Sequence, residues 1–475
     1  MADADLRAQM ASVTDGLAEA LRATPGVDAW QVATTRRDEA QIYLIGAEIE
    51  EARRTVSSAE SAVTIHNLHT RRLEEDADAS DATGGAARSD EAALGVATLT
   101  VQPDELAESG PLEARLRDGA LMASLTDNQA FHLPAEPARG FPVVEAEDLA
   151  LGGSIAAAVE RAAQQLQAAL RQTPGVRLGS AELYAVRIHT ALANSQGLSA
   201  SKRETSVSLD LALIAGEGDH AAEFHAELRR RRLSDLHLER VVAAYGAFAL
   251  HALHATAPDA WEGPVILSGE AAAQFFNPIY GGPLVAHTSA EMAYRKLSRL
   301  AAGEFVTPEE PRGDRLTLVS DATRPYGSRT EPFDGSGVPA HNVMLIEGGV
   351  FRRPWADAKY AQYLGVEATG DIGNLTVACG ATPLERLRSA EAGPVYEVVA
   401  FSLFNPDPVT GDFSTEIRLG YRHDATGTQP IKGGALVGNI FAALGDARFS
   451  AESFSDGVYL GPAGIRFGAL KIAGG

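Results

Sequence analysis

The sequence predicts an α+β protein of two domains, with a pseudo-repeated α+β domain at residues 1–260 and a mostly β domain at residues 261–475. Three observations support this prediction. A helix-ending phrase at residues 20–27, ALRATPGV, returns at residues 169–176 as ALRQTPGV, and strand-like runs follow both copies. Apolar and β-branched runs dominate after Leu316. The length of 475 residues also exceeds that of one ordinary domain.

The charge balance argues against two classes of partner. The chain has 41 Lys and Arg against 63 Asp and Glu, and its formal net charge is -22. Such a charge repels phosphate backbones and anionic lipids, so neither nucleic acid nor a membrane surface is an expected partner. No apolar stretch reaches the roughly 20 residues that cross a bilayer, and residues 1–10 lack the features of a signal peptide. We therefore expect a cytoplasmic location.

Cysteine usage limits the metal and redox chemistry. Cys379 is the only cysteine of the chain. An internal disulfide is therefore impossible, and so is a zinc site with several thiolates from this chain. We interpret Cys379 as a small apolar residue.

In the N-terminal domain, helical periodicity and turn residues place the elements in order. Helices are expected at residues 5–22 and 154–171, and strands at 40–45, 62–65, 182–189 and 206–213. The run Asn194-Ser195-Gln196-Gly197 is a turn signal. Ser234 is expected to cap a long helix that runs through His254 and is ended by Pro258.

An acidic segment interrupts this domain at residues 74–93, EEDADASDATGGAARSDEAA. It contains no large apolar side chain, so it buries too little apolar area to offset the entropy of ordering. The sequence therefore predicts a mobile loop here.

The C-terminal domain is expected to open with a strand at residues 264–267 and a short helix at 269–276 capped by Ser268. Thr288-Ser289-Ala290-Glu291 is a capping box for a helix that ends near Gly303. Mostly strands follow, at residues 316–319, 343–346, 395–404 and 414–422, with a terminal pair around 458–472.

The most distinctive stretch is residues 316–365. Two apolar runs flank a loop rich in glycine and proline, and a turn at Glu347-Gly348-Gly349 follows the second run. Because glycine adopts positive φ at little cost, the pattern predicts strand, long shaped loop, strand, tight turn, strand. A long ordered loop of this kind is more often functional than idle.

This stretch resembles the TldD/PmbA family of zinc-peptidase-like proteins, whose members carry a similar Gly-Ser-Arg…Pro-Phe-Asp…Gly-Val-Pro…Leu-Ile-Glu-x-Gly segment. The matching residues are Gly327, Ser328, Arg329, Pro332, Phe333, Asp334, Gly337, Val338, Pro339, Leu345, Ile346, Glu347 and Gly349. The resemblance covers roughly residues 182–475, including the loop at 405–414. Within the family, the chain is most similar to the TldE/PmbA-type subunit.

Active members of the family carry His-Glu-x-x-x-His on the helix that follows the strand matching residues 264–267. Two imidazoles one helical turn apart can face one zinc ion, while the glutamate acts as base. Here residues 268–280 read SGEAAAQFFNPIY, without a histidine, and Pro278 interrupts the helix. The resemblance therefore implies no metal site, no cofactor and no catalytic residue on this chain, with zinc expected on a partner.

Four residues are predicted to contact substrate. Tyr280 and His287 lie near the region that matches the family's active site, and Asp412 and Ser414 lie at the end of the loop at 405–414. The alternative for His287 is a solvated loop histidine. The alternative for the loop is turn formation by its Asp, Pro and Gly residues.

Two further histidine pairs are weaker metal candidates. His251 and His254 lie three residues apart on one predicted helix, without an accompanying carboxylate, and we interpret them as helix packing residues. His220 and His225 flank a predicted turn and are interpreted as solvated side chains.

Together these features predict a metal-site-lacking subunit of a heterodimeric zinc metallopeptidase-type hydrolase. The subunit would shape a cavity for a peptide or peptide-like substrate beside a TldD-like zinc-bearing partner. The alternatives are a subunit acting on a modified small molecule in specialised metabolism, a stand-alone binding protein, and a self-sufficient hydrolase that uses His251 and His254. The sequence has no Walker loop, G-x-G-x-x-G or G-x-S-x-G motif.

Overall fold

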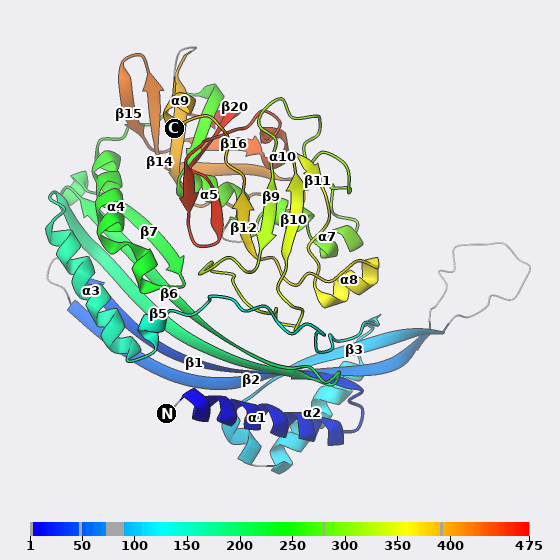
Figure 1. Cartoon of the computed structure of the whole chain (residues 1–475). Coiled ribbons are helices and arrows are strands. Elements are labelled where there is room, and N and C mark those ends of the chain that lie inside the picture. Colours follow the sequence, from blue (N-terminus) through cyan, green and yellow to red (C-terminus); the bar gives the residue numbers. More distant parts are fainter. Residues whose placement is uncertain are drawn as a thin grey trace, which may run out of the picture.

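The computed structural model describes residues 3–46, 50–72, 90–107, 109–278, 281–389 and 393–474. Three β-sheets and the helices packed on them make up this part of the chain. The first sheet is long and curved, and it wraps around the other two (Figure 1). The predicted α+β fold class is confirmed.

Two similar runs of elements build the first sheet. The first run is α1 (Asp3–Ala23), β1 (Ala29–Ile45), β2 (Glu50–Arg72), β3 (Asp90–Val101) and α2 (Ser109–Ser124); the second is α3 (Ile155–Arg171), β5 (Val176–Asn194), β6 (Ser199–Ala215), β7 (Ala222–Arg230) and α4 (Leu238–Leu253). With β4 (Asn128–Gln129) at one edge, the strand order is β4-β3-β2-β1-β5-β6-β7. The pseudo-repeat predicted from a short phrase therefore extends to whole elements.

The repeated phrase ends α1 and α3 in the same way. Thr24 and Thr173 each donate the side-chain hydroxyl to the main-chain carbonyl four residues earlier, at 2.8 and 3.0 Å. Gly26 and Gly175 follow, with φ of 82° and 79°. A positive φ turns the chain out of the helix toward the next strand and favours glycine. Local sequence thus sets both helix ends.

The two runs meet at β1 and β5 in the middle of the sheet. These strands pair antiparallel, with Asp38 directly opposite Arg187. Arg187 Nη2 lies 3.4 Å from Asp38 Oδ2. Main-chain hydrogen bonds and this cross-strand ion pair therefore join the two halves.

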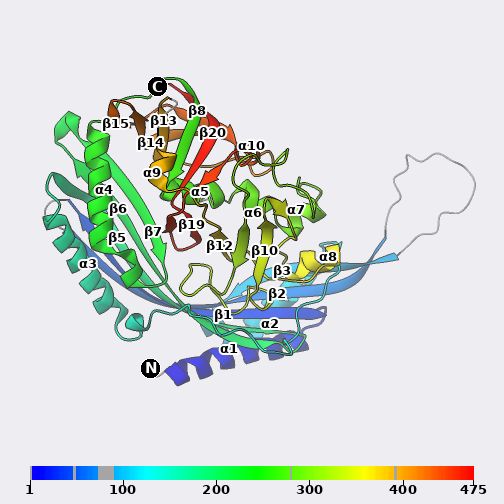
Figure 2. The ribbon, with the colours of Figure 1, turned by 45° about the horizontal axis from the view of Figure 1, so that its top comes forward.

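The helices cover one face of this sheet and leave the other for the rest of the chain. Alternate residues of a strand share a face. On β1, Trp30 and Val32 pack into the cluster of α1 and α2, and Ile42 and Leu44, on the same face, pack with α3. The concave face receives residues 128–148 and the C-terminal sheets (Figures 1 and 2).

Residues 261–474 form two sheets over one shared core. Their strands are β8 (Trp261–Ser268), β9 (Leu318–Asp321), β10 (Asn342–Glu347), β11 (Val350–Phe351), β12 (Asn374–Val377), β13 (Val395–Phe401), β14 (Asp412–Asp424), β15 (Gly427–Ile431), β16 (Ala435–Asn439), β17 (Arg448–Phe449), β18 (Ser453–Ser455), β19 (Tyr459–Pro462) and β20 (Gly464–Ala473). Their helices are α5 (Glu270–Phe276), α6 (Pro283–His287), α7 (Ala290–Tyr294), α8 (Ala358–Leu364), α9 (Leu384–Leu387) and α10 (Ile440–Ala443).

The two C-terminal sheets differ in closure. One is open, in the order β11-β10-β9-β12-β19-β18. The other has the order β13-β8-β20-β16-β14-β15, with β17 on β20, and β13 also pairs with β14. These pairings close β13, β8, β20, β16 and β14 into a ring.

Helix α5 lies against both C-terminal sheets. It contacts β8 and β13 of the ring and β19 of the open sheet. Phe275 and Phe276 are fully buried, and Phe276 stacks on Tyr459 with 5.7 Å between ring centroids. Because it is packed on both sides, α5 is a fixed support for the residues at its two ends.

The predicted stretch from β9 to β11 is confirmed, but two predicted helix starts are wrong. Ser234 lies in a 3-10 turn, and α4 instead begins after His237, whose φ is 47°. Ser268 ends β8 and donates its hydroxyl to Glu397 at 2.6 Å, so it does not cap α5. Ser234 is part of a local turn, and the Ser268 hydroxyl binds Glu397, so neither hydroxyl caps the helix that follows it.

Other boundaries also differ. The predicted capping box makes Thr288 the cap, but Ser289, one residue later, caps α7. That helix ends at Tyr294, and the chain turns at Lys296 with φ of 57°. The predicted terminal strands are not a pair, because β19 and β20 belong to different sheets. Residues 74–89 of the predicted acidic loop lie outside the described residues, and residues 90–93 instead begin β3.

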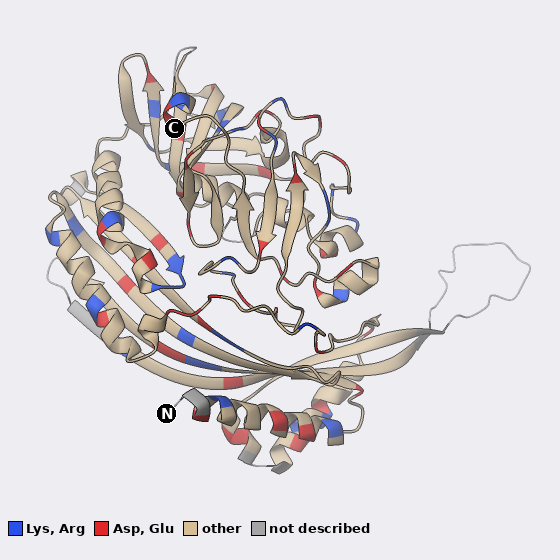
Figure 3. Cartoon of the chain, in the orientation of Figure 1, with Lys and Arg blue, Asp and Glu red and all other residues tan. Residues whose placement is uncertain are grey.

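Charged residues of both signs are interspersed along the sheets and helices of the described part of the chain (Figure 3). No described helix is long and apolar enough to cross a membrane.

Candidate functional site

The C-terminal end of α5 is where the resemblance places the metal-binding helix. The helix ends at Phe276, Asn277 adopts φ of -135°, and Pro278 follows. Arg329 Nη2 donates to Asn277 Oδ1 at 2.9 Å. At the end of α5, the side-chain amide of Asn277 is thus already bound by the Arg329 guanidinium. The positive charge of this guanidinium would repel a metal cation.

The loop between β9 and β10, residues 322–341, brings Arg329 to this position. Asp334 shapes the tip of the loop, because its Oδ1 accepts hydrogen bonds from the main-chain N–H groups of Ser336 and Val338, both at 2.9 Å. Asp334 is only 3% exposed, and its Oδ2 is buried without a hydrogen bond. The aspartate thus organises the loop through one oxygen and leaves the other open to a donor.

Gly337 joins the loop tip to the turn between β5 and β6. Its φ is 95°, and a methyl group on it would lie 2.7 Å from Leu198 Cδ1. We expect Gly337→Ala to lower the free energy of unfolding by about 1–3 kcal/mol, because both backbone strain and overpacking oppose it. Urea denaturation measures the change. Gly335→Ala is the matched control, since a methyl group there meets open space; equal midpoints for the two variants would contradict the expectation.

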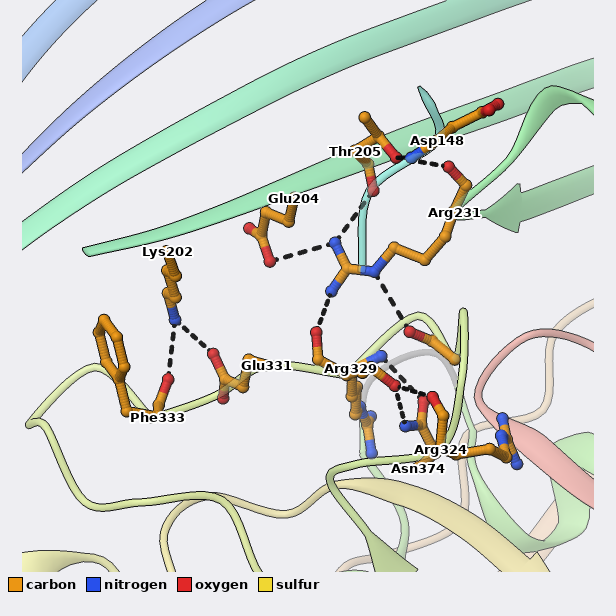
Figure 4. A network of polar contacts seen from close by, with 12 residues as sticks. Asp148, Lys202, Glu204, Thr205, Arg231, Arg324, Arg329, Glu331, Phe333 and Asn374 are labelled. Carbon is orange, nitrogen blue, oxygen red and sulfur yellow. Dashed lines mark hydrogen bonds and ion pairs between the residues drawn. The ribbon is translucent and has the colours of Figure 1, made fainter. Parts of the chain in front are cut away.

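Arg231 anchors the same loop to the first sheet (Figure 4). Its guanidinium donates to the carbonyl oxygens of Gly327 at 3.2 Å, Thr330 at 3.0 Å and Thr205 at 3.0 Å. It also lies 3.1 Å from Glu204 Oε2, and its side chain is 7% exposed. Because the Arg231 guanidinium donates to both the loop and β6, it holds the loop at a fixed distance from the first sheet.

Lys202 of β6 makes a second anchor (Figure 4). Its Nζ donates to Glu331 Oε2 at 2.5 Å and to Phe333 O at 3.0 Å. The ring of Phe333 is buried against Leu192 and Leu198. The loop is therefore held on the concave face by charge at one point and by apolar packing at the next.

Carboxyl groups gather around this loop. Burial raises the pKa of Glu331, although Lys202 opposes the shift, and burial also raises the pKa of Asp357. Desolvation, then repulsion by Asp334 and Glu331, raises the pKa of Asp371 to about 6, although that residue reaches solvent. Four carboxyl groups beside one ammonium favour cationic over anionic substrate groups here.

His287 is buried in a structural role. It is 1% exposed, and its Nδ1 accepts a hydrogen bond from the Arg299 N–H at 2.9 Å. Its Nε2 is 2.9 Å from Val409 O, which assigns the proton to Nε2. Burial lowers the pKa of the ring. The interpretation as a solvated residue is therefore wrong, and a ring nitrogen could contact substrate only by giving up one of these bonds.

The other predicted residues lie apart from α5 or outside the described residues. Asp412 and Ser414 are exposed on the same face of β14, and Asp412 accepts a hydrogen bond from Asn439 Nδ2 at 2.8 Å. Asp407 Oδ1 binds the N–H groups of Val409 and Thr410, so it forms the predicted turn. Tyr280 lies outside the described residues. Asp412 and Ser414 thus lie together on β14, and His287 contacts Val409 of the loop that precedes them.

The other histidines considered as metal ligands are exposed, and His251 and His225 bind ordinary partners. His251 Nδ1 lies 2.8 Å from the Tyr421 hydroxyl, and His254 is exposed at the end of α4. His225 pairs with Asp210 at 2.6 Å on the surface. In the described ranges, no group of three or more His, Cys, Asp or Glu side chains is placed to hold a metal. The residues present therefore do not fit the zinc that the resemblance places in active members.

Sequence reasoning missed the residues that position the loop, namely Arg231, Lys202 and the Asn277–Arg329 pair. Arg231 belongs to a run of four arginines at 229–232. The sequence does not indicate which of the four side chains is buried, because the alternation of buried and exposed residues along β7 ends at Arg230.

Family models define the class of protein. Residues 261–474 match a model described as the PmbA/TldA metallopeptidase C-terminal domain, and residues 143–253 match the central domain of the same class. These matches span most of the chain. The protein belongs to the TldD/PmbA family.

Individual relatives agree with this assignment. The crystal structure of TldE from Thermococcus kodakarensis has a TM-score of 0.75 to this chain at 19% identity, covering 97% of this chain and all of that one. A zinc metalloprotease TldD homolog of Saccharolobus solfataricus is 22% identical over 58% of this chain and 65% of its own length. An uncharacterized protein of Methanocaldococcus jannaschii is 27% identical over 29% of this chain and 35% of its own length. The chain thus spans from about a third to just under two thirds of these two relatives.

Proposed function

We propose that this chain is the metal-free, TldE-like subunit of a cytoplasmic heterodimer, and that its partner is a TldD-like chain which carries the zinc. The pair hydrolyses peptides or peptide-like substrates, so it acts in proteolysis. In this proposal the present chain completes the substrate cavity and contributes no catalytic residue.

One observation carries the proposal. At the end of α5, where the metal helix of active members continues, Arg329 holds Asn277 and Pro278 stops the helix. An arginine in that position is compatible with substrate binding but not with a zinc site. A homologue without its own metal can still exclude water and orient a substrate.

The chain offers two kinds of substrate contact. The carboxyl groups around Asp334 and Asp371 can receive a basic group of the substrate. An extended peptide can add to β18, an edge strand of the open sheet. The other edge strand, β11, is already bound on its outer side by residues 303–305. Asp412 and Ser414 are further contacts in this proposal.

The test is reconstitution with a chain from the same genome that carries His-Glu-x-x-x-His. We expect turnover of an extended-peptide library, read by mass spectrometry, only when both chains are present. Zinc, measured by elemental analysis, should follow the partner. Changing the partner's glutamate of that motif should abolish turnover with assembly intact, because this residue activates the attacking water.

Asp412→Ala in this chain should raise KM about 2- to 10-fold, because it removes a positioning contact and leaves the metal in place. Asp118→Ala, on the exposed surface of α2, is the matched control. Full activity of the partner alone would contradict the subunit proposal and favour a binding protein. One tightly held zinc on this chain alone would favour the self-sufficient hydrolase, and turnover of small molecules without peptides would favour specialised metabolism.

A further inference from the structure

A cavity of about 540 Å³ lies between α4, the end of β7, the segment around β18 and the beginning of α5. It sits at the opposite end of α5 from Asn277, a distance of about 10 Å along seven residues of helix. The volume is in the range of sites that hold small organic molecules. It is therefore a separate feature from the loop site described above.

The walls of the cavity are largely apolar. They include Leu228, Leu236, Val241, Phe248, Val399 and Phe454. Carboxyl groups also line it, from Asp235, Glu270 and Glu397. An apolar body with one polar group of fixed charge is the ligand shape that such a site favours.

Two of these three carboxyl groups are already neutralised. Glu397 accepts hydrogen bonds from Arg388 Nε and Nη2 at 2.8 and 2.7 Å and from Ser268 Oγ at 2.6 Å. Asp235 accepts two hydrogen bonds from Arg232, both at 2.9 Å. The negative charges of Glu397 and Asp235 are therefore already balanced by arginine side chains.

Glu270 is different. It accepts a hydrogen bond from the Tyr245 hydroxyl, and among the residues that the structure describes it forms no ion pair. Burial, and then repulsion by Asp456, raises the pKa of Glu270 to about 7, while Arg230 opposes the shift. Arg230 itself donates to the main-chain carbonyl oxygens of Arg229 and Asp456. The carboxyl of Glu270 is thus the cavity's unneutralised acid.

We propose that this cavity binds an organic amine, with the ammonium group on Glu270 and the apolar body against α4 and Phe454. Arg230, Arg240 and Arg388 also line the cavity, but among the described residues none of them forms an ion pair with Glu270. An ammonium group would supply that ion pair, and the aromatic rings of Tyr245 and Phe248 favour a cation beside them. This proposal does not rest on a partner subunit or on hydrolysis.

The surrounding charges set the pH dependence. Asp456 and Arg230 face Glu270 with opposite signs, and Tyr245 donates to it. Arg240 also lines the cavity but is exposed on α4, where solvent screens its charge. Ammonium binding requires ionised Glu270, so affinity should rise about tenfold between pH 6 and pH 8, as the ionised fraction grows from about a tenth to about nine tenths.

The experiment titrates the full chain with 2-phenylethylamine by calorimetry, with 2-phenylethanol as the uncharged probe of the same shape. We expect the amine to bind at least tenfold more tightly than the alcohol at pH 8. Glu270→Gln should remove this preference and the pH dependence. Glu239→Gln, an exposed residue of the first turn of α4, is the matched control and should leave both unchanged.

A second variant tests the cavity without touching its charge. Ala244→Trp fills the space from α4 and should abolish binding of both probes while Glu270 is intact. Equal affinity for amine and alcohol, an unaltered amine affinity in Glu270→Gln or Ala244→Trp, or no measurable amine binding at millimolar concentration would each overturn the proposal.

Discussion

Replacing Glu397 by glutamine is expected to lower the free energy of unfolding by about 3 kcal/mol at pH 7. The Glu397 side chain is 1% exposed, and it binds Arg388, Ser268 and His423, the last at 2.8 Å. An amide of the same shape cannot accept all of these bonds, and it leaves the guanidinium of Arg388 without its counter-charge. Breaking one side of a buried pair typically costs this much.

The same group predicts a pH dependence. Burial alone would raise the pKa of Glu397, but hydrogen bonds from His423, Arg388 and Ser268 lower it to about 2. A carboxyl with a lowered pKa in the folded state stabilises the protein above its unfolded pKa, and this stabilisation is lost as the pH falls. The difference between wild type and Glu397→Gln should therefore be fully present at pH 7 and should shrink from about pH 4.5 toward pH 2.

Urea denaturation at pH 7 and pH 3 measures both effects. Glu262→Gln is the matched control, because Glu262 lies on the neighbouring strand β8 in an exposed pair with Lys471 and should contribute less than about 1 kcal/mol. An unchanged midpoint for Glu397→Gln at pH 7 would show that the cluster is not a source of stability.

Replacing Arg231 by methionine is the second large effect expected. Methionine fills a similar volume but donates no hydrogen bond, so the carbonyl oxygens of Gly327, Thr330 and Thr205 lose their donor. Glu204 also loses its counter-charge. Hydrogen bonds to a charged group contribute about 1.5–3 kcal/mol each, and relaxation of the loop toward solvent recovers part of the loss. We expect a net decrease of about 3 kcal/mol in the free energy of unfolding.

The readout that separates anchoring from general stability is local hydrogen exchange. Amides of residues 322–341 should exchange faster in Arg231→Met than amides of the five-stranded ring, because the guanidinium connects this loop to the first sheet. Arg229→Met is the matched control, since the Arg229 side chain is 68% exposed. Uniform exchange rates throughout the two variants would contradict the anchoring role.

Local signals in the sequence predicted the features that depend on local chemistry. The Thr-Pro-Gly phrase correctly indicated both helix ends, because a threonine hydroxyl and a positive-φ glycine act within a few residues. The loop between β9 and β10 was predicted for the same reason, since Asp334 and Gly337 shape it through short-range hydrogen bonds and backbone freedom.

Features that depend on distant residues were not predictable from local patterns. The partners of Glu397 come from residues 268, 388 and 423, and no periodicity relates these positions. His287 could not be recognised as buried, because its partners, Val409 and Arg299, reach it through tertiary packing. β19 pairs with β12 and β20 pairs with β8, which belong to different sheets. Because these partners are distant in the sequence, the adjacency of β19 and β20 in the chain suggested a false pair.

The pairing of Asp38 with Arg187 has a consequence for the history of the chain. The same number of residues separates these two as separates the two copies of the repeated phrase, so they are equivalent positions of the two halves. They face each other because a pseudo-two-fold axis passes between β1 and β5. In an ancestral dimer of identical halves, a residue on that axis would meet its own copy, and a charged residue would repel itself. Two halves joined in one chain can differ in sequence, so opposite charges such as Asp38 and Arg187 can meet at the axis only when the halves are not identical.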